Sequence, residues 1–241
     1  MADNITRKEI KYRLNSALLE VLTREFAPYL RKDKFFFEKI HNIYFDNDSD
    51  ELIRISLERP VFKEKLRFRG YELDGSLYPY IFAEIKKKYR GIVYKRRCRL
   101  PLSEMREMVR GEKSFAEILG DGQVAREMLF FIKQTKCYPK LYLSYDRYSY
   151  RAKDDEDLRI TFDLNILSRT ENLDMSVDPE SDKSLLDENE FIMEIKAGYA
   201  FPLWLTKILS KYKIYPVTFT KYGKIYENSL RKVPLKEISY V

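Results

Sequence analysis

The chain has 241 residues, of which 44% are hydrophobic and 15% aromatic. This composition excludes a disordered polymer and provides enough chain for a full hydrophobic core. An excess of 45 Lys and Arg over 38 Asp and Glu leaves a net charge of +7. Such a balance favours an anionic partner, for example a nucleic acid, a nucleotide, polyphosphate or a membrane surface.

The termini and the cysteines bear on where the protein works. The first residues are charged and lack the apolar region of a signal peptide, and no stretch approaches the ~20 apolar residues of a membrane helix. Cys98 and Cys137 lack the spacing of a metal site and suit a reducing compartment. No linker or low-complexity segment divides the chain. We therefore expect a cytoplasmic protein without a membrane span, folded as a single domain over residues 1–241.

The first half of the chain alternates apolar and polar residues with the period of two that is typical of strands. In the clearest case, basic side chains share one face of the segment 62–74, while Leu66 and Phe68 take the other. Arg90-Gly91 is a turn signal between two further segments and predicts a hairpin. We expect strands at 7–14, 34–46, 62–74, 79–90 and 91–100, with helices at about 16–31 and 49–57.

The second half mixes helical and strand patterns. Apolar residues recur at helical spacing around Val124 and Met128, and again after Pro202, a favoured first residue of a helix. The acidic segment 172–189 is typical of an exposed loop. We expect helices at 103–110, 114–135 and from Pro202, strands at 139–151, 157–168 and 190–198, and room for a short strand in the tail from Tyr215.

The tripeptide Glu-Ile-Lys occurs three times, at 9–11, 84–86 and 194–196. Read as strands, these tripeptides each place a carboxylate and an ammonium on one face. The ordinary alternative is a sheet whose charged face meets water. However, like charges opposite each other destabilise a sheet, so the repetition favours a surface that binds an anion. The like charges on neighbouring predicted strands are Lys63, Lys65, Arg67 and Arg69, then Lys86 and Lys88, then Lys95, Arg97 and Arg99.

These elements predict an α+β fold in which about eight mostly antiparallel strands form a closed barrel. Helices with apolar stripes would cover the outside and leave the charges in the lumen, as a tunnel for an anion. Arg suits bidentate contact with phosphate, and Lys acts as a point charge. A lone Glu among many cations suits a divalent metal better than a proton.

Eight short motifs occur in an order that resembles a known family. They are Arg-Lys-Glu-Ile-Lys-Tyr (7–12), Ile-Tyr-Phe-Asp (43–46), Leu-Arg-Phe-Arg-Gly-Tyr (66–71), Ala-Glu-Ile-Lys (83–86), Val-Tyr-Lys-Arg-Arg (93–97), Tyr-Asp-Arg-x-x-Tyr-Arg (145–151), Leu-Arg-Ile-Thr-Phe-Asp (158–163) and Met-Glu-Ile-Lys (193–196). From about residue 7 to 226 the chain is similar to the VTC (vacuolar transporter chaperone) domain. This is the polyphosphate polymerase branch of the CYTH-like triphosphate tunnel metalloenzymes.

The resemblance implies a tunnel of eight antiparallel strands that binds ATP or another triphosphate. With Mn or Mg, such a domain transfers the terminal phosphate to inorganic polyphosphate. The resemblance implies that Glu194 is the metal ligand and that Lys196, Arg67, Arg69 and Lys86 are catalytic. The implied phosphate-binding residues are Lys11, Arg67, Arg69, Lys86, Lys95, Arg159, Lys196 and Lys221.

Three positions qualify the resemblance. Thr218 stands near where the family's C-terminal motif usually carries a first lysine, before Lys221. Other tunnel branches carry a second metal ligand in the first strand, and whether Glu9 has that role here is undecided. Arg147 matches a family motif, but a bulge in its strand would decide which face it takes.

Two other functions stay open at this point. An inorganic triphosphatase would use the same tunnel with water as the acceptor. A module that binds polyphosphate or a nucleotide without turnover would fit the absent lysine. Nucleic-acid binding is disfavoured: aromatic residues can stack bases, but most of the 19 Tyr and 15 Phe fall at core positions of the predicted elements.

Overall fold

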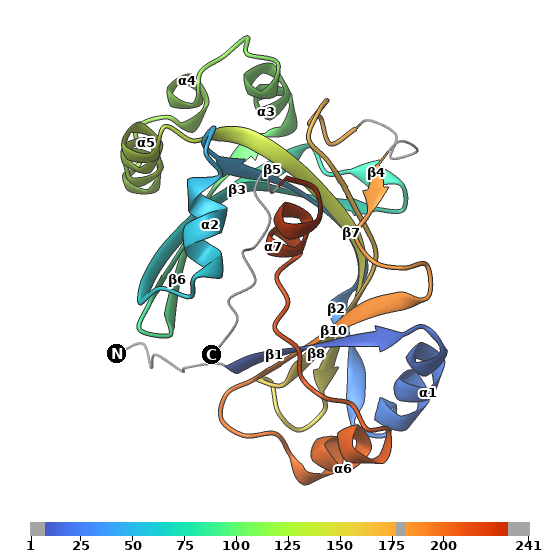
Figure 1. Ribbon diagram of the computed structural model, residues 1–241. Coiled ribbons are helices and arrows are strands. Elements are labelled where there is room, and N and C mark those ends of the chain that lie inside the picture. The colour runs from blue at the N-terminus through green and yellow to red at the C-terminus, as the bar shows by residue number, and fades with distance from the viewer. Residues whose placement is uncertain (1–7, 177–181, 231–241) are drawn as a thin grey trace.

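Figure 1 shows a computed structural model of the chain, which describes residues 8–176 and 182–230. The strands are β1 (Lys8–Asn15), β2 (Leu30–Asp46), β3 (Phe62–Leu73), β4 (Ser76–Leu77), β5 (Tyr80–Tyr89), β6 (Ile92–Pro101), β7 (Tyr138–Ala152), β8 (Arg159–Arg169), β9 (Lys183–Ser184) and β10 (Glu190–Ala197). The helices are α1 (Ala17–Phe26), α2 (Glu51–Leu57), α3 (Leu102–Val109), α4 (Phe115–Leu119), α5 (Gln123–Thr135), α6 (Leu203–Lys211) and α7 (Lys221–Ile225), followed by a π-helical turn at Tyr226–Leu230.

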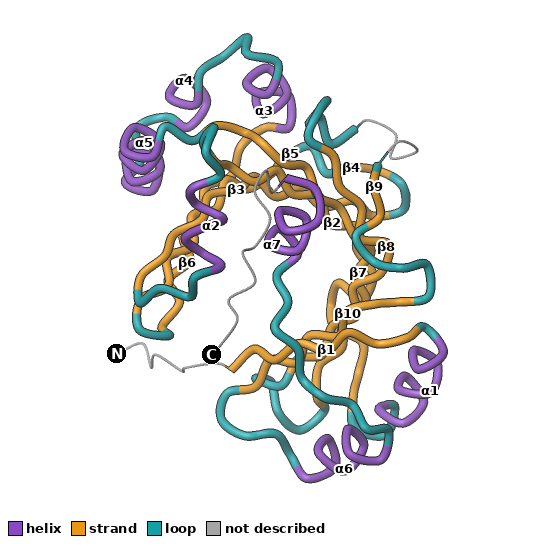
Figure 2. The backbone as a smooth tube through the Cα atoms, viewed as in Figure 1, coloured by secondary structure: helices purple, strands orange, loops and turns teal. Residues whose placement is uncertain are grey.

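Eight strands form one antiparallel sheet in the order β1-β10-β8-β7-β2-β3-β5-β6, with β4 and β9 paired at its margins. The predicted antiparallel α+β fold is therefore confirmed. The sheet curls into a deep trough (Figures 1 and 2). In the described part of the chain its two ends, β1 and β6, are not paired with each other. The expected closure into a barrel is not found.

The free edge of β1 explains part of this difference. The backbone N–H of Val217 donates to the carbonyl oxygen of Lys11 at 2.8 Å, as an isolated antiparallel bridge. The segment that leads to α7 therefore lies along the edge that a closing strand would use. Closure of a sheet depends on such contacts between distant segments, which the period of a single strand does not report.

The hairpin of β5 and β6 turns where the sequence predicts. Arg90 and Gly91 have φ values of 46° and 87°. Two consecutive residues with positive φ are what a type I′ turn requires, and this turn matches the twist of the flanking strands. The turn sets the register that places Lys86 opposite Lys95 and Glu84 opposite Arg97.

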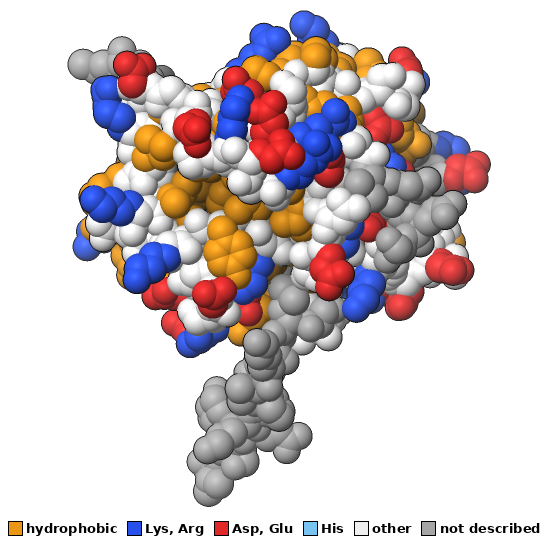
Figure 3. Space-filling model, turned by 90° about the horizontal axis from the view of Figure 1, so that it is seen from above, with side chains coloured by type: hydrophobic (Ala, Val, Ile, Leu, Met, Phe, Trp, Pro, Cys, Tyr) orange, Lys and Arg blue, Asp and Glu red, His pale blue; other side chains and the backbone are white. Residues whose placement is uncertain are grey.

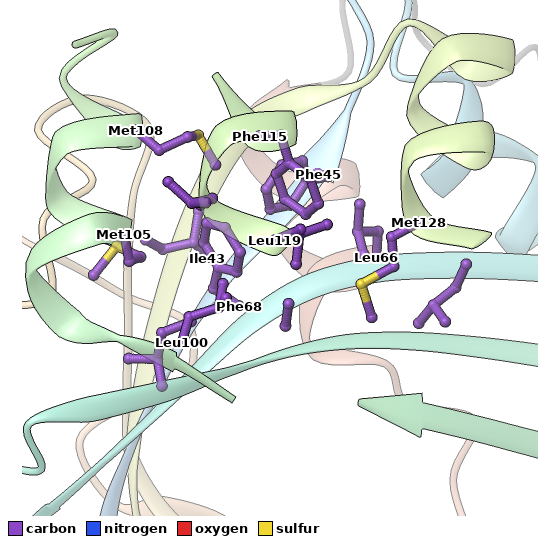
Figure 4. Close-up of a cluster of buried hydrophobic side chains, with 14 of the residues drawn as sticks. Ile43, Phe45, Leu66, Phe68, Leu100, Met105, Met108, Phe115, Leu119 and Met128 are labelled. Carbon is purple, nitrogen blue, oxygen red and sulfur yellow. The ribbon is translucent and has the colours of Figure 1, made fainter. Parts of the chain in front are cut away.

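Alternation along the strands places one apolar set on the convex side of the sheet. There, Leu66 and Phe68 of β3 pack under α3, α4 and α5 (Figure 4). The ring of Phe68 stacks on Phe115 at 5.5 Å and meets Phe45 edge-on at 5.0 Å. Above this core the outer surface carries acidic and basic side chains side by side (Figure 3), as an ordinary solvated face does.

A second convex core lies under α1 and α6, against β1, β8 and β10. Leu22 and Phe26 of α1 and Leu205 of α6 are buried in it. Trp204 stacks on Tyr29 at 4.3 Å, so the single tryptophan has a packing role. Because these contacts use the odd-numbered residues of β10, such as Met193 and Ile195, the even-numbered Glu194 and Lys196 face the trough.

The concave side also holds apolar residues, which the sequence did not predict. Phe219, Tyr222 and Ile225 of the α7 region form a buried cluster with Ile192 and Leu143 of the trough. Helix α7 thus lies inside the curl of the sheet (Figure 1) rather than on its outside. It fills part of the lumen and leaves the rest to charged groups.

Several predicted boundaries are wrong. The first helix ends at Phe26 rather than near 31. Gly120, with φ 67°, splits the predicted 114–135 helix into α4 and α5. The predicted exposed loop 172–189 includes β9 and the buried Met175, although residues 177–181 lie outside the described part. The tail from Tyr215 adds a bridge and α7 rather than a strand.

Along the described residues, no helix has the length and apolar character needed to cross a membrane.

Candidate functional site

A cavity of about 290 Å³ lies on the concave side of the sheet. Side chains from β1, β2, β3, β5, β7 and β10 line it, together with residues of α2 and of the start of α7. Its basic side chains are Lys11, Lys63, Lys65, Arg67, Arg69, Lys86, Lys88, Arg147, Lys196 and Lys221, and its carboxylates are Glu9, Glu84 and Glu194.

One wall of the cavity is a set of lysines that we call the lysine ladder (Lys63, Lys65, Lys86 and Lys88). Across the β3–β5 pair, Lys63 lies opposite Lys88 and Lys65 lies opposite Lys86. Neither Lys65 nor Lys86 forms an ion pair with any carboxylate of residues 8–176 or 182–230. Like charges directly opposite in a sheet are destabilising, so this wall carries repulsion that no ion pair at Lys65 or Lys86 relieves among the described residues.

The ladder changes the acidity of its own members. Burial, together with the charges of Lys63 and Lys86, lowers the pKa of Lys65 to about 8. Burial is also the largest cause that lowers the pKa of Lys86; Arg67 and Lys196 add to it, and the charge of Glu9 offsets part of the fall. A polyanion bound in the cavity would reverse both effects, because it favours the charged form of each lysine.

Next to the ladder, Glu84 holds the arginines of β3 in place. Arg67 donates to this carboxylate from Nε at 2.9 Å and from Nη2 at 2.7 Å, and Arg69 lies 3.9 Å away. Lys95 of β6 pairs with the other oxygen. Burial alone would raise the pKa of Glu84, but the three cations outweigh it and hold the pKa at about 2. Glu84 therefore stays ionised and orients Arg67.

The opposite wall is organised around Glu194. Its carboxylate lies 3.2 Å from the Lys11 ammonium, 3.4 Å from Lys221 and 3.5 Å from Arg147. Arg147 and Lys221 share a second carboxylate, Asp163, which is fully buried and lies 2.6 Å from the Arg147 guanidinium. Burial opposes the ionised form of Glu194, yet these cations hold its pKa well below the usual range.

Glu9 of β1 completes this wall. It lies 3.4 Å from Lys11 and 3.4 Å from Lys196, and these two lysines outweigh burial to lower its pKa to about 2. The Lys11 ammonium thus occupies a point within 3.4 Å of both Glu9 and Glu194. Two carboxylates of different strands therefore converge on one cation position.

Most of the predicted site residues meet in this cavity. Glu194 and six of the predicted phosphate-binding residues line it: Lys11, Arg67, Arg69, Lys86, Lys196 and Lys221. Lys95 contacts Glu84 from the next strand rather than lining the cavity. Arg159 does not line it either; it pairs with Asp33 at 3.1 Å and lies opposite Lys196 in the β8–β10 register. Thr218 is exposed and accepts a hydrogen bond from Arg59 at 3.0 Å.

Sequence reasoning left the side of Arg147 undecided and missed Tyr44 and Tyr145, although all three line the cavity. A register shift in the β7–β8 pair between Ser144 and Asp146 places a bulge on β8, at Asn165 with φ 48°, rather than in the strand that carries Arg147. Between Tyr145 and Arg147, β7 is regular, so ordinary alternation places both side chains on the concave side, with Asp163 of β8 opposite Arg147. Such a bulge has no clear sequence signal, since Asn tolerates positive φ in many turns.

The carboxylates offer a partial set of metal ligands. Within the described residues, no group of three or more His, Cys, Asp or Glu is placed to hold a metal ion. Mg²⁺, however, is commonly held by one or two carboxylates plus the phosphates of a substrate. The convergence of Glu9 and Glu194 on one cation position fits that mode.

Comparisons with known proteins identify the family of the chain and a protein that shares its fold. The family model of the VTC domain matches residues 6–229, so the chain belongs to the VTC domain family. The search of curated proteins returns no relative. A putative adenylate cyclase from Bacillus halodurans is 14% identical and covers 89% of this chain and 95% of its own, with a TM-score of 0.52. A putative adenylate cyclase from Vibrio parahaemolyticus is 9% identical, covers 91% and 97%, and has a TM-score of 0.46. The Bacillus structure shows a shared fold.

Proposed function

We propose that the cavity binds the triphosphate group of a nucleoside triphosphate, or inorganic polyphosphate. The observation that carries this is the lysine ladder, whose like charges lie opposite each other and face a space lined by Arg67, Arg69 and Arg147. A structural surface would mix the two signs, as the outer face does (Figure 3). Membership of the VTC domain family supports the same ligand class.

We further propose that the protein is a polyphosphate polymerase-type phosphotransferase. An oxygen of the terminal phosphate of polyphosphate would attack the γ-phosphorus of the bound nucleotide. The new P–O bond forms as the bond between the γ-phosphorus and the bridging oxygen breaks, and the nucleoside diphosphate leaves with that oxygen. Such a transfer depends on positioning and charge neutralisation rather than on a nucleophilic side chain.

The residues of the cavity have distinct parts in this mechanism. Arg67, oriented by Glu84, and Arg69 would hold phosphate oxygens through their planar donors. Lys86 and Lys196, from opposite walls, would hold the reacting phosphates in line. A Mn²⁺ or Mg²⁺ ion held by Glu194 and Glu9 would add neutralising charge next to the terminal phosphates.

No histidine base takes part in this proposal. His41 lies on the convex side, bonded to Tyr142 at 2.7 Å and to Glu72 at 3.0 Å. Burial, with the charge of Lys39, lowers its pKa to about 4, so the ring is neutral at physiological pH. Its role is that of a buried polar residue whose hydrogen bonds are satisfied.

A product assay tests the reaction. Purified protein is incubated with ATP and Mn²⁺, and products are separated on a gel stained for polyphosphate. We expect polymer from wild type, none from Lys196→Ala, and wild-type yield from Lys207→Ala, an exposed lysine of α6. Free phosphate without polymer would mean that the protein hydrolyses triphosphate and does not transfer phosphate to polyphosphate. Binding of polyphosphate without any product would leave a binding module.

The lowered pKa of Lys65 predicts a pH dependence. Above about pH 8 free Lys65 loses its proton, so triphosphate affinity should fall by up to tenfold per pH unit. Lys65→Arg keeps its charge and should move the fall to higher pH. The stability of the ligand-free protein changes with pH in the opposite direction to the affinity. Between the folded pKa of about 8 and the unfolded value of 10.5 the unfolded chain binds more protons, so the Lys65 contribution to stability rises with pH. Calorimetric titration between pH 7 and 9.5 measures the affinity; an equal fall in Lys65→Arg would contradict this assignment.

A further inference from the structure

A second chemically distinct surface adjoins the cavity on the concave face of β5 and β6. We call it the arginine–aromatic strip (Tyr80, Phe82, Arg97 and Arg99). The Arg99 guanidinium carbon lies 3.6 Å from the centre of the Tyr80 ring, and that of Arg97 lies 4.3 Å from the centre of Phe82. The two rings meet edge-on at 5.7 Å. The strip is therefore a layer of guanidinium groups over a layer of rings.

The two guanidinium groups have unused hydrogen-bonding capacity. Both arginines are exposed, and neither guanidinium makes an ion pair or a hydrogen bond with any residue that the structure describes. Their neighbours on the same strand differ: Lys95 pairs with Glu84, and Arg96, on the opposite face, pairs with Glu127 at 3.1 Å. The planar outer faces and N–H edges of Arg97 and Arg99 are thus available to a ligand.

The strip continues directly from the phosphate-binding side chains. Phe82 lies opposite Arg69 in the β3–β5 register, and Arg97 lies opposite Glu84 in the β5–β6 register. On β5, Phe82 precedes Glu84 by one repeat of the strand face, which is about 6.6 Å along the strand. A ligand that spans both surfaces would have an anionic part at Arg67 and Arg69 and a flat part at Phe82.

We propose that the arginine–aromatic strip binds the base of the nucleoside triphosphate whose phosphates occupy the cavity. This inference rests on the proposed function and adds a subsite for the nucleoside. An aromatic base would stack on the free face of a guanidinium that already stacks on a ring. Stacking of this kind tolerates different bases, because every base has a π face. A further run of phosphates would use the charges but not the rings, so the rings favour a base.

The test compares ATP with inorganic tripolyphosphate, which has the phosphates but no base. Calorimetry gives both dissociation constants for wild type, Arg99→Met, which keeps most of the apolar stem, and Phe82→Leu, which keeps an apolar side chain. We expect ATP binding to weaken about tenfold in each variant, with tripolyphosphate binding unchanged in Phe82→Leu. Tyr94→Ala, on the opposite face of the same hairpin, is the matched control and should bind both ligands as wild type does.

Four outcomes would overturn the inference. Unchanged ATP binding in both variants would show that no base contacts the strip. An equal loss for ATP and tripolyphosphate would make the strip a further contact for phosphates. If wild type binds neither ligand, the proposed function fails first, and the base subsite falls with it. If wild type binds tripolyphosphate but binds ATP tenfold more weakly, the base subsite is rejected and the proposed function stands.

Discussion

Replacing Lys65 by methionine is expected to stabilise the ligand-free protein and to weaken its binding of triphosphate. Methionine keeps most of the apolar stem and removes a charge that faces Lys86 with no carboxylate partner in the described part of the chain. The lowered pKa of Lys65 shows that its charge opposes the folded state. We expect a gain of roughly 1–3 kcal/mol in the free energy of unfolding. Loss of one charge-assisted phosphate contact should weaken binding by about 1.5–3 kcal/mol.

Urea denaturation with and without tripolyphosphate measures both effects. The matched control is Lys207→Met, which removes an exposed lysine of α6 and should change neither quantity. A Lys65→Met protein that is less stable than wild type would mean that Lys65 contributes to folding rather than to binding. Unchanged affinity for tripolyphosphate would remove Lys65 from the binding site.

Replacing Asp163 by asparagine is expected to be strongly destabilising. Asp163 is fully buried and accepts from both Nε and Nη2 of Arg147 at 2.6 Å, while it also pairs with Lys221. Asparagine has the same shape but no charge, so the two buried cations would share Glu194 alone. Breaking a buried ion pair on one side costs about 3–5 kcal/mol, because the remaining charge is uncompensated. The free energy of unfolding, measured by denaturant titration, should fall by that order.

Two further variants show whether charge is the cause. The double variant Asp163→Asn with Lys221→Met removes one cation as well, and should recover part of the loss. Glu156→Gln breaks the exposed pair with Arg31 and should have little effect, since exposed pairs contribute little. If Asp163→Asn is as stable as wild type, the charge of Asp163 does not stabilise the folded protein.

The sequence predicted the strands well because each strand has one face against a core. On β3, Leu66 and Phe68 are buried under the helices while Lys65 and Arg67 face the cavity. The same alternation placed Glu194 and Lys196 together, so most of the basic lining could be predicted from period two alone.

What could not be predicted depends on contacts between distant segments. The edge of β1 meets Val217, and that contact is absent from any local pattern. The bulge at Asn165 on β8 has no local signal either, and the apolar cluster of Phe219, Tyr222 and Ile225 brought α7 into the lumen. Arg159, which the motif assigns to the site, pairs with Asp33 and stays a predicted phosphate ligand.

The most direct test of the account is the affinity of the wild-type protein for tripolyphosphate. Isothermal titration at pH 7.5 with tripolyphosphate, and with orthophosphate as the short control, measures whether the cavity recognises an extended polyanion. We expect the protein to bind tripolyphosphate at least a hundredfold more tightly than orthophosphate, and to lose this binding in an Arg67→Met, Lys86→Met double variant that still folds. Equal affinity for the two ions, or binding that persists in the double variant, would contradict the claim that this cavity is a triphosphate site.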